Sequence, residues 1–78
     1  MSRDQVQSEI LAILNAVLKR EATPDSSRKN LPQWDSLKHV EIIFAVEDAF
    51  GVQFSEEELF ELDSVENIAA SIIAKHAA

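Results

Sequence analysis

The chain has 78 residues, which fits one small domain spanning 1–78, and 46% of them are hydrophobic, which is too many for a disordered segment. Fourteen acidic and seven basic residues give a net charge of −7, so the protein should repel nucleic acids and anionic membranes and attract a basic protein partner. The chain contains no cysteine, which excludes disulfides, cysteine metal sites and a thiol nucleophile of its own.

The N-terminal sequence predicts no secretion signal. Residues 1–5 contain no apolar stretch, and no apolar run in the chain approaches the ~20 residues needed to span a membrane. We therefore expect a soluble, cytoplasmic protein, and we expect it to be a monomer.

The first predicted helix runs from about Asp4 to Arg20. Its apolar residues recur at helical spacing, Ser2 and Gln5 fit a capping box, and Lys19 with Arg20 suits the negative end of the helix dipole. A loop rich in turn-forming residues follows over residues 21–34. A connection of this length is often functional or mobile.

The second predicted helix starts at Asp35 or Ser36 and ends near Phe50. Gly51, the only glycine, stands where a left-handed residue is needed to end the helix. The spacing of apolar residues along the second helix gives it two apolar faces, of which one is expected to face the core. The expected core residues of this helix are Ile42, Ile43, Val46, Ala49 and Phe50.

The second apolar face of this helix is flanked by carboxylates. It holds Leu37, Val40, Glu41, Phe44, Glu47 and Asp48. This face is either packed against other helices or exposed as a recognition surface, with apolar contacts for affinity and carboxylates that steer a basic partner. Leu37, nearest the helix start, is the part most expected to be exposed.

Two further helices complete the predicted fold. A capping box over Ser55–Glu58 opens a short helix that ends near Glu61. Asp63, with Glu66 three residues later, opens the last helix, which ends near His76. Three long helices and one short helix, with a long loop between the first two, predict an all-α fold: a small antiparallel bundle.

The hydroxyl of Ser36 stands at the start of the second helix. Unpaired backbone N–H groups and the positive end of the helix dipole lie there, so a phosphate ester on this hydroxyl would be stabilised. The simpler interpretation of the pair Asp35-Ser36 is helix capping by a side-chain oxygen. The residues alone leave both interpretations open.

The run Trp34-Asp35-Ser36-Leu37, the pair Val40-Glu41 and the Glu-rich end of the helix that closes in Phe50 resemble the acyl carrier proteins. The resemblance implies that Ser36 carries a 4′-phosphopantetheine arm, added from coenzyme A by a phosphopantetheinyl transferase. It also implies that the arm holds acyl groups as thioesters for enzymes of fatty-acid, polyketide or related biosynthesis. The protein itself would then be a carrier and not an enzyme.

The same resemblance assigns two sets of residues to partners and cargo. Partner enzymes with basic docking surfaces would contact Asp35, Leu37, Val40, Glu41, Phe44, Glu47 and Asp48. A sheltered acyl chain would lie between the second and last helices, near Val46, Phe54, Leu59, Leu62 and Ile68. Because Phe44, Phe54 and Phe60 occupy volume, we expect a short cargo.

Two residues beside Ser36 depart from the pattern of fatty-acid-type carriers. Trp34 stands where those carriers usually have a small residue, and Lys38 stands where they commonly have an acid. We expect both on the surface that a partner reads, where a bulky indole and a reversed charge would weaken binding to general fatty-acid synthesis enzymes. This favours a carrier that serves a dedicated pathway.

An enzymatic site and a metal site are both disfavoured by the sequence. Asp35, Ser36 and His39 suggest a hydrolase triad, but neighbouring helical residues diverge by ~100° and a triad needs groups that converge. His39 is instead expected to pack at or near the core. The acids of the short helix, from Glu56 to Glu58 and Glu61, form a solvated turn and do not converge on one metal ion.

The main alternative function is an unmodified helical interaction module. Such a protein would dock through the face of Leu37, Val40 and Phe44, and phosphorylation could regulate it. Replacement of Ser36 by alanine separates the two functions, because only the carrier needs the serine.

Overall fold

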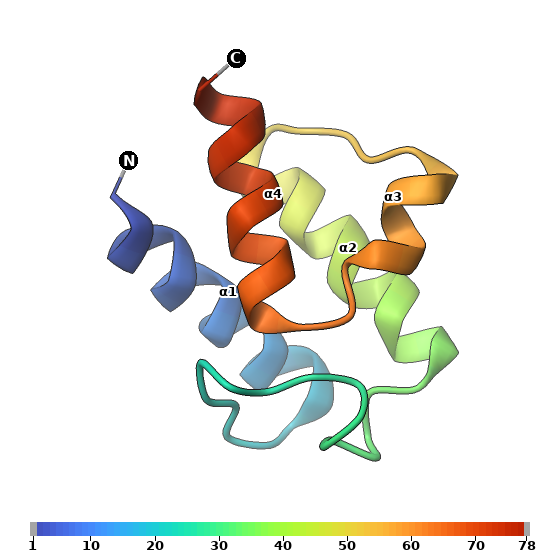
Figure 1. The fold of residues 1–78 in the computed structure, drawn as a ribbon. Coiled ribbons are helices and arrows are strands. Elements are labelled where there is room, and N and C mark those ends of the chain that lie inside the picture. Colours follow the sequence, from blue (N-terminus) through green and yellow to red (C-terminus); the bar gives the residue numbers. More distant parts are fainter. Residues whose placement is uncertain (1, 78) are drawn as a thin grey trace.

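The computed structural model describes residues 2–77 and confirms the all-α fold (Figure 1). The helices in chain order are α1 (Arg3–Leu18), α2 (Ser36–Phe50), α3 (Glu56–Glu61) and α4 (Val65–Ala77). Successive helices alternate in direction, and the start of α1 and the end of α4 both lie away from the α1–α2 loop (Figure 1). The two end residues of the predicted domain, 1 and 78, lie outside the described residues.

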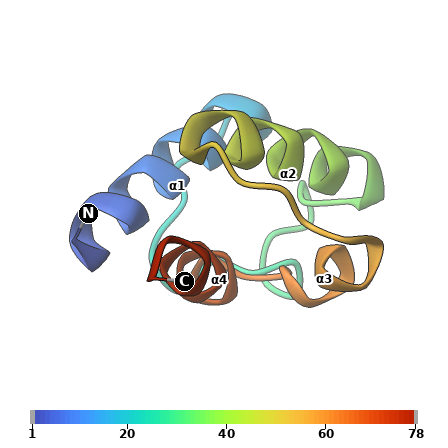
Figure 2. The ribbon, with the colours of Figure 1, turned by 90° about the horizontal axis from the view of Figure 1, so that it is seen from above.

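Two layers of helices enclose the core. Seen from above, α1 and α2 form one layer, and α4 and α3 form the other (Figure 2). Helix α1 packs against both α4 and α2. The buried apolar side chains of these three helices are Val6, Ile10, Leu14, Leu18, Ile42, Ile43, Val46, Phe50, Val65, Ile68, Ala69 and Ile72. Ala49 was predicted to join them but is exposed, because it stands at the edge of the apolar arc.

Helix α1 begins as predicted but ends earlier. The Ser2 hydroxyl accepts the Gln5 N–H at 3.2 Å and the Gln5 side chain accepts the Ser2 N–H at 3.1 Å, which confirms the capping box. Lys19 adopts a left-handed backbone with φ of 53°, so the helix stops at Leu18. The predicted end of the helix near Arg20 is therefore too late, and Lys19 is the C-cap.

The predicted signals at both ends of α2 are confirmed. Asp35 is the N-cap, and its carboxylate accepts the N–H of Lys38 at 2.9 Å. Gly51 ends the helix with φ of 66°, and its N–H donates to the carbonyl of Glu47. A side chain at this backbone angle would be strained, which explains why the only glycine of the chain stands here.

The two shorter connections also depend on serine caps. The Ser55–Glu58 capping box at the start of α3 is present as predicted. For α4 the prediction is wrong by one residue, since the Ser64 hydroxyl accepts the N–H of Asn67 at 3.0 Å. The carboxylate of Asp63 instead accepts the Asn67 side-chain amide at 3.0 Å.

Backbone hydrogen bonds attach the α1–α2 loop to the α3–α4 turn. The N–H of Arg28 donates to the carbonyl of Asp63 at 2.9 Å, and the N–H of Val65 donates to the carbonyl of Ser26 at 3.0 Å. Ser27 and Ser64 form an antiparallel bridge between these bonds. The loop also contributes the buried side chains of Ala22, Leu31 and Trp34 to the core.

In the part of the chain that the structure covers, none of the helices is long and apolar enough to cross a bilayer.

Candidate functional site at the start of α2

Ser36 is the first residue of α2, and it is exposed. Asp35 caps the helix with its carboxylate, and the carbonyl of Asp35 accepts the N–H of His39 at 2.8 Å. The capping interpretation therefore applies to Asp35. The Ser36 hydroxyl is not the cap, so it can take part in other chemistry without loss of the helix start.

The guanidinium of Arg28 reaches Ser36 from the α1–α2 loop. Its Nη2 donates to the Ser36 hydroxyl oxygen at 3.4 Å, and its Nε donates to the carbonyl of Trp34 at 3.4 Å. Arg28 was not among the residues predicted from the sequence, because it precedes Ser36 by eight residues in a segment without periodicity. Only the path of the loop brings the two side chains together.

Trp34 lies in the core, which corrects the prediction that a partner reads it at the surface. Its side chain is only 2% exposed, and its indole N–H donates to Nδ1 of His39 at 2.9 Å. The expectation that a bulky indole weakens partner binding therefore has no structural basis. His39 is itself buried, at 7% exposure, which confirms its predicted place near the core.

The carboxylate-flanked face of α2 is exposed at its apolar centre. Leu37 is 70% exposed, Val40 42% and Phe44 64%. Of the two interpretations of this face, packing against further helices is therefore wrong within this molecule. We refer to Leu37, Val40 and Phe44 as the apolar ridge of α2.

The charged residues around the apolar ridge differ in their exposure and in their bonding partners. Glu41 and Asp48 are exposed, and Glu41 pairs with Lys38 at 3.6 Å. Lys38 is thus at the surface, as expected, but its charge is balanced by its neighbour. Glu47 is half-buried and accepts the N–H of Phe54 at 2.7 Å, so it also fixes the segment between α2 and α3.

The residues predicted to shelter an acyl chain are part of the core or packed against it. Val46, Leu62 and Ile68 are buried, and Phe54 and Leu59 are partly buried against the core. Two aromatic residues that were expected to restrict the cargo do not do so. Phe44 and Phe60 are both exposed and occupy no interior volume.

Among the acids of α3, Glu58 contributes both to the start of the helix and to the contact with α4. Glu58 accepts the N–H of Ser55 at 3.0 Å and pairs with Lys75 at 2.9 Å, while the Lys75 ammonium lies 5.2 Å from the centre of the Phe54 ring. The Ser55 hydrogen bond, followed by Lys75, lowers the pKa of the Glu58 carboxyl from its usual 4.5. Among the described residues, no three His, Asp or Glu side chains are placed to hold a metal ion.

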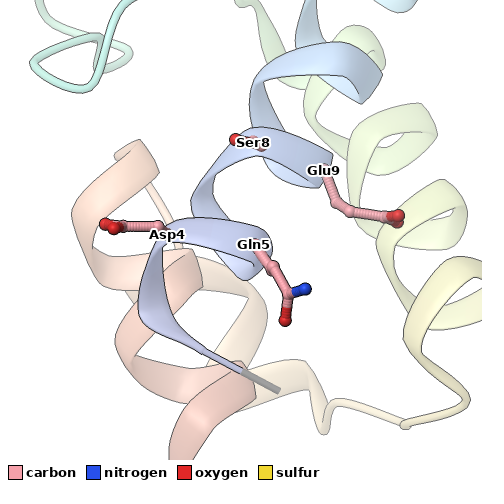
Figure 3. Close-up of a pocket in the computed structure, with 4 residues that line it drawn as sticks. All are labelled: Asp4, Gln5, Ser8 and Glu9. Atoms are coloured by element: carbon pink, nitrogen blue, oxygen red, sulfur yellow. The ribbon is translucent and has the colours of Figure 1, made fainter.

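A hollow on α1 lies beside its first turns. It is lined by Asp4, Gln5, Ser8 and Glu9. The side chains of Asp4 and Glu9 point in opposite directions from the helix (Figure 3). These polar groups therefore do not converge on one ligand, and the hollow adds nothing to the site at Ser36.

Comparison with known proteins identifies the family of this chain. The family model described as "Phosphopantetheine attachment site" matches residues 8–72, a range that includes Ser36. An acyl carrier protein 3 of Ralstonia nicotianae is 34% identical over 71 residues, which cover 91% of this chain and 80% of the relative. An acyl carrier protein of Rubrobacter xylanophilus is 33% identical over 79 aligned residues, which cover 97% of this chain and 96% of the relative.

The chain belongs to the acyl carrier protein family, whose phosphopantetheine-binding domain carries 4′-phosphopantetheine. Proteins of this family are carriers and not catalysts. The start of α2 fits such a group, because the Ser36 hydroxyl is exposed and is not used as the cap. The Arg28 guanidinium and the positive end of the α2 dipole both favour a phosphate at this position.

Proposed function

We propose that Ser36 carries the 4′-phosphopantetheine arm, and that the protein delivers acyl groups to enzymes of fatty-acid, polyketide or related biosynthesis. The observation that carries this proposal is the exposed hydroxyl at the first residue of α2, within the part of the chain that matches the family. The arm supplies a thiol that holds acyl groups as thioesters, a chemistry for which this cysteine-free chain has no group of its own.

Attachment requires a phosphopantetheinyl transferase and coenzyme A. The Ser36 oxygen attacks the phosphorus next to the pantetheine of coenzyme A, and a new oxygen–phosphorus bond forms. The bond from that phosphorus to the bridging oxygen of the diphosphate breaks, so adenosine 3′,5′-bisphosphate leaves and the serine proton is released. Asp35 keeps α2 capped throughout, because its own carboxylate is not consumed.

The apolar ridge of α2 supports a docking role toward enzymes with basic surfaces. Leu37, Val40 and Phe44 supply apolar contact area next to Ser36, and Asp35, Glu41, Glu47 and Asp48 supply the negative charge around it. Apolar contacts provide affinity in such an interface, and complementary charges raise the rate of association. Cargo is proposed to lie near Val46, Phe54, Leu59, Leu62 and Ile68.

Intact mass after incubation with coenzyme A and a broad-specificity phosphopantetheinyl transferase tests the attachment. The wild type should gain one arm, and Ser36→Ala should gain none. Ser55→Ala is the matched control, because it removes another serine hydroxyl at a helix start that serves only as a cap. This control should gain the arm while losing about 1 kcal/mol of stability.

The wild type remaining unmodified while folded would overturn the proposal. It would favour the alternative of an unmodified docking module that binds through the apolar ridge. In a reconstituted pathway, that module would tolerate Ser36→Ala and lose activity with Val40→Asp. A carrier should lose activity with Ser36→Ala although its fold is retained.

A further inference from the structure

We propose that Arg28 is a phosphate-binding residue that holds the phosphodiester of the arm against the start of α2. This inference rests on the proposed attachment to Ser36 and assigns a role to a residue outside the Asp35-Ser36-Leu37 run. Its starting point is the contact at 3.4 Å between Arg28 Nη2 and the Ser36 hydroxyl oxygen.

The geometry places a cation where the phosphate must form. After attachment, the Ser36 oxygen becomes the ester oxygen, and the two non-bridging oxygens of the phosphodiester, which share one negative charge, are one atom further away. A guanidinium that already lies at 3.4 Å from the ester oxygen can reach one of these charged oxygens by a small side-chain rotation. A charge-assisted hydrogen bond of this kind is about twice as strong as a neutral one.

Arg28 is held in position before any arm is attached. Its backbone N–H donates to the carbonyl of Asp63 at 2.9 Å, and its Nε donates to the carbonyl of Trp34 at 3.4 Å. Trp34 is itself fixed, because its side chain is buried and hydrogen-bonded to His39. The guanidinium therefore loses little additional freedom when it binds the phosphate, which favours a stable contact.

The surrounding charges make Arg28 the cation best placed for this contact. Asp35, directly before Ser36, brings a negative charge that would repel the phosphate. Lys38 is already paired with Glu41 at 3.6 Å. Lys29, next to Arg28, is exposed, whereas Arg28 is half-buried and directed to Ser36. Lys29 thus provides a matched control, since its removal changes the charge of the loop by the same amount.

The experiment compares thermal unfolding before and after attachment of the arm in three proteins: wild type, Arg28→Gln and Lys29→Gln. Each is modified to completion, which intact mass confirms, so the rate of modification does not enter. Modification should raise the unfolding midpoint of the wild type by about 4–8 °C more than it raises that of Arg28→Gln. Lys29→Gln should respond to modification as the wild type does.

Phosphorus NMR of the modified proteins gives a second, independent signal. The phosphodiester resonance should shift between wild type and Arg28→Gln, and it should stay in place in Lys29→Gln. Arg28→Lys keeps the charge but loses the planar guanidinium with its several donors. Its phosphodiester resonance should lie between those of the wild type and Arg28→Gln.

The outcomes separate this inference from the proposed function. An equal response to modification in all three proteins, with an unchanged phosphorus resonance, would overturn the role of Arg28 and leave the attachment to Ser36 intact. Failure of the folded wild type to gain an arm would overturn both. If Arg28→Gln and Lys29→Gln reduce the rise of the unfolding midpoint on modification by the same amount, the effect is one of general loop charge. That result would also overturn the specific contact.

Discussion

The imidazole of His39 links two elements through its two nitrogens. The indole N–H of Trp34 can only donate, so Nδ1 of His39, at 2.9 Å, accepts. Nε2 then carries the proton and donates to the carbonyl of Leu59 at 2.7 Å. This single tautomer connects the end of the α1–α2 loop, α2 and α3 in one chain of hydrogen bonds, of which the bond to Trp34 is buried and the bond to Leu59 partly buried.

Trp34→Phe tests the first bond of this chain. The substitution keeps an aromatic ring but leaves Nδ1 of His39 without its donor in a buried place, so the free energy of unfolding should fall by about 1–3 kcal/mol. Urea unfolding followed by circular dichroism measures the loss. The same substitution in a His39→Leu background should cost less, because no acceptor is then left unpaired. Equal costs in both backgrounds would show that the hydrogen bond contributes nothing.

The burial of some of these side chains could be predicted from the sequence, and that of others could not. The helical spacing placed His39 near the core and Leu37 at the surface, and both predictions are confirmed. Trp34 was misplaced because it belongs to a loop, where no periodicity indicates which side chains are buried. Its burial depends on a hydrogen-bond partner and on a loop path that tertiary packing decides. The contact of Arg28 with Ser36 was missed for the same reason.

Among the elements, helix boundaries were predicted best where capping residues mark them. The capping boxes at Ser2 and Ser55 and the glycine at the end of α2 act within a few residues, so the sequence contains their whole signal. The end of α1 was placed too late. There the side chain of Asn15 accepts the N–H of Ala22 at 2.6 Å, and the chain turns back over the helix. Such a contact between a helix and its following loop has no periodic signature.

The link between α3 and α4 should respond to pH through Glu58. Because the pKa of this carboxyl is lowered in the folded protein, its contribution to stability is complete above the unfolded value near 4.5. That contribution is lost as the pH falls through the lower folded value. Glu58→Gln should therefore reduce the fall in unfolding midpoint between neutral pH and about pH 3.

A neighbouring acid provides the control for this measurement. Glu57 is exposed on the same short helix, and Glu57→Gln removes the same charge one residue away. If both substitutions change the pH profile equally, general charge repulsion accounts for it, and the bonds to Ser55 and Lys75 do not. A change confined to Glu58→Gln assigns the effect to those bonds.

For the whole molecule, the dominant electrostatic property is the net charge of −7 on a chain of 78 residues. The ion pairs Lys38–Glu41 and Lys75–Glu58 are at least partly exposed, so they offset little of the repulsion among the remaining acids. Like-charge repulsion of this kind lowers the stability of the compact state and is screened by salt.

The unfolding midpoint should therefore rise when salt is added at neutral pH. Calorimetry between about 10 mM and 300 mM sodium chloride measures the change, a range over which the screening length falls well below the size of the molecule. Asp48→Asn, which removes one exposed charge, should raise the midpoint at low salt and reduce its dependence on salt. A midpoint that does not change with salt would mean that the acids are spaced too widely to repel.

The bridge between Ser27 and Ser64 has a consequence for the order of events in folding. It joins the loop that holds Arg28 to the turn before α4, so the contact closes a large part of the chain. Contacts across such separations form only after the entropy of loop closure has been overcome. A nascent chain that has reached only the end of α2 contains Ser36 but has no Asp63 to anchor Arg28. The contact between Arg28 and Ser36 is thus complete only after the turn before α4 has folded against the α1–α2 loop.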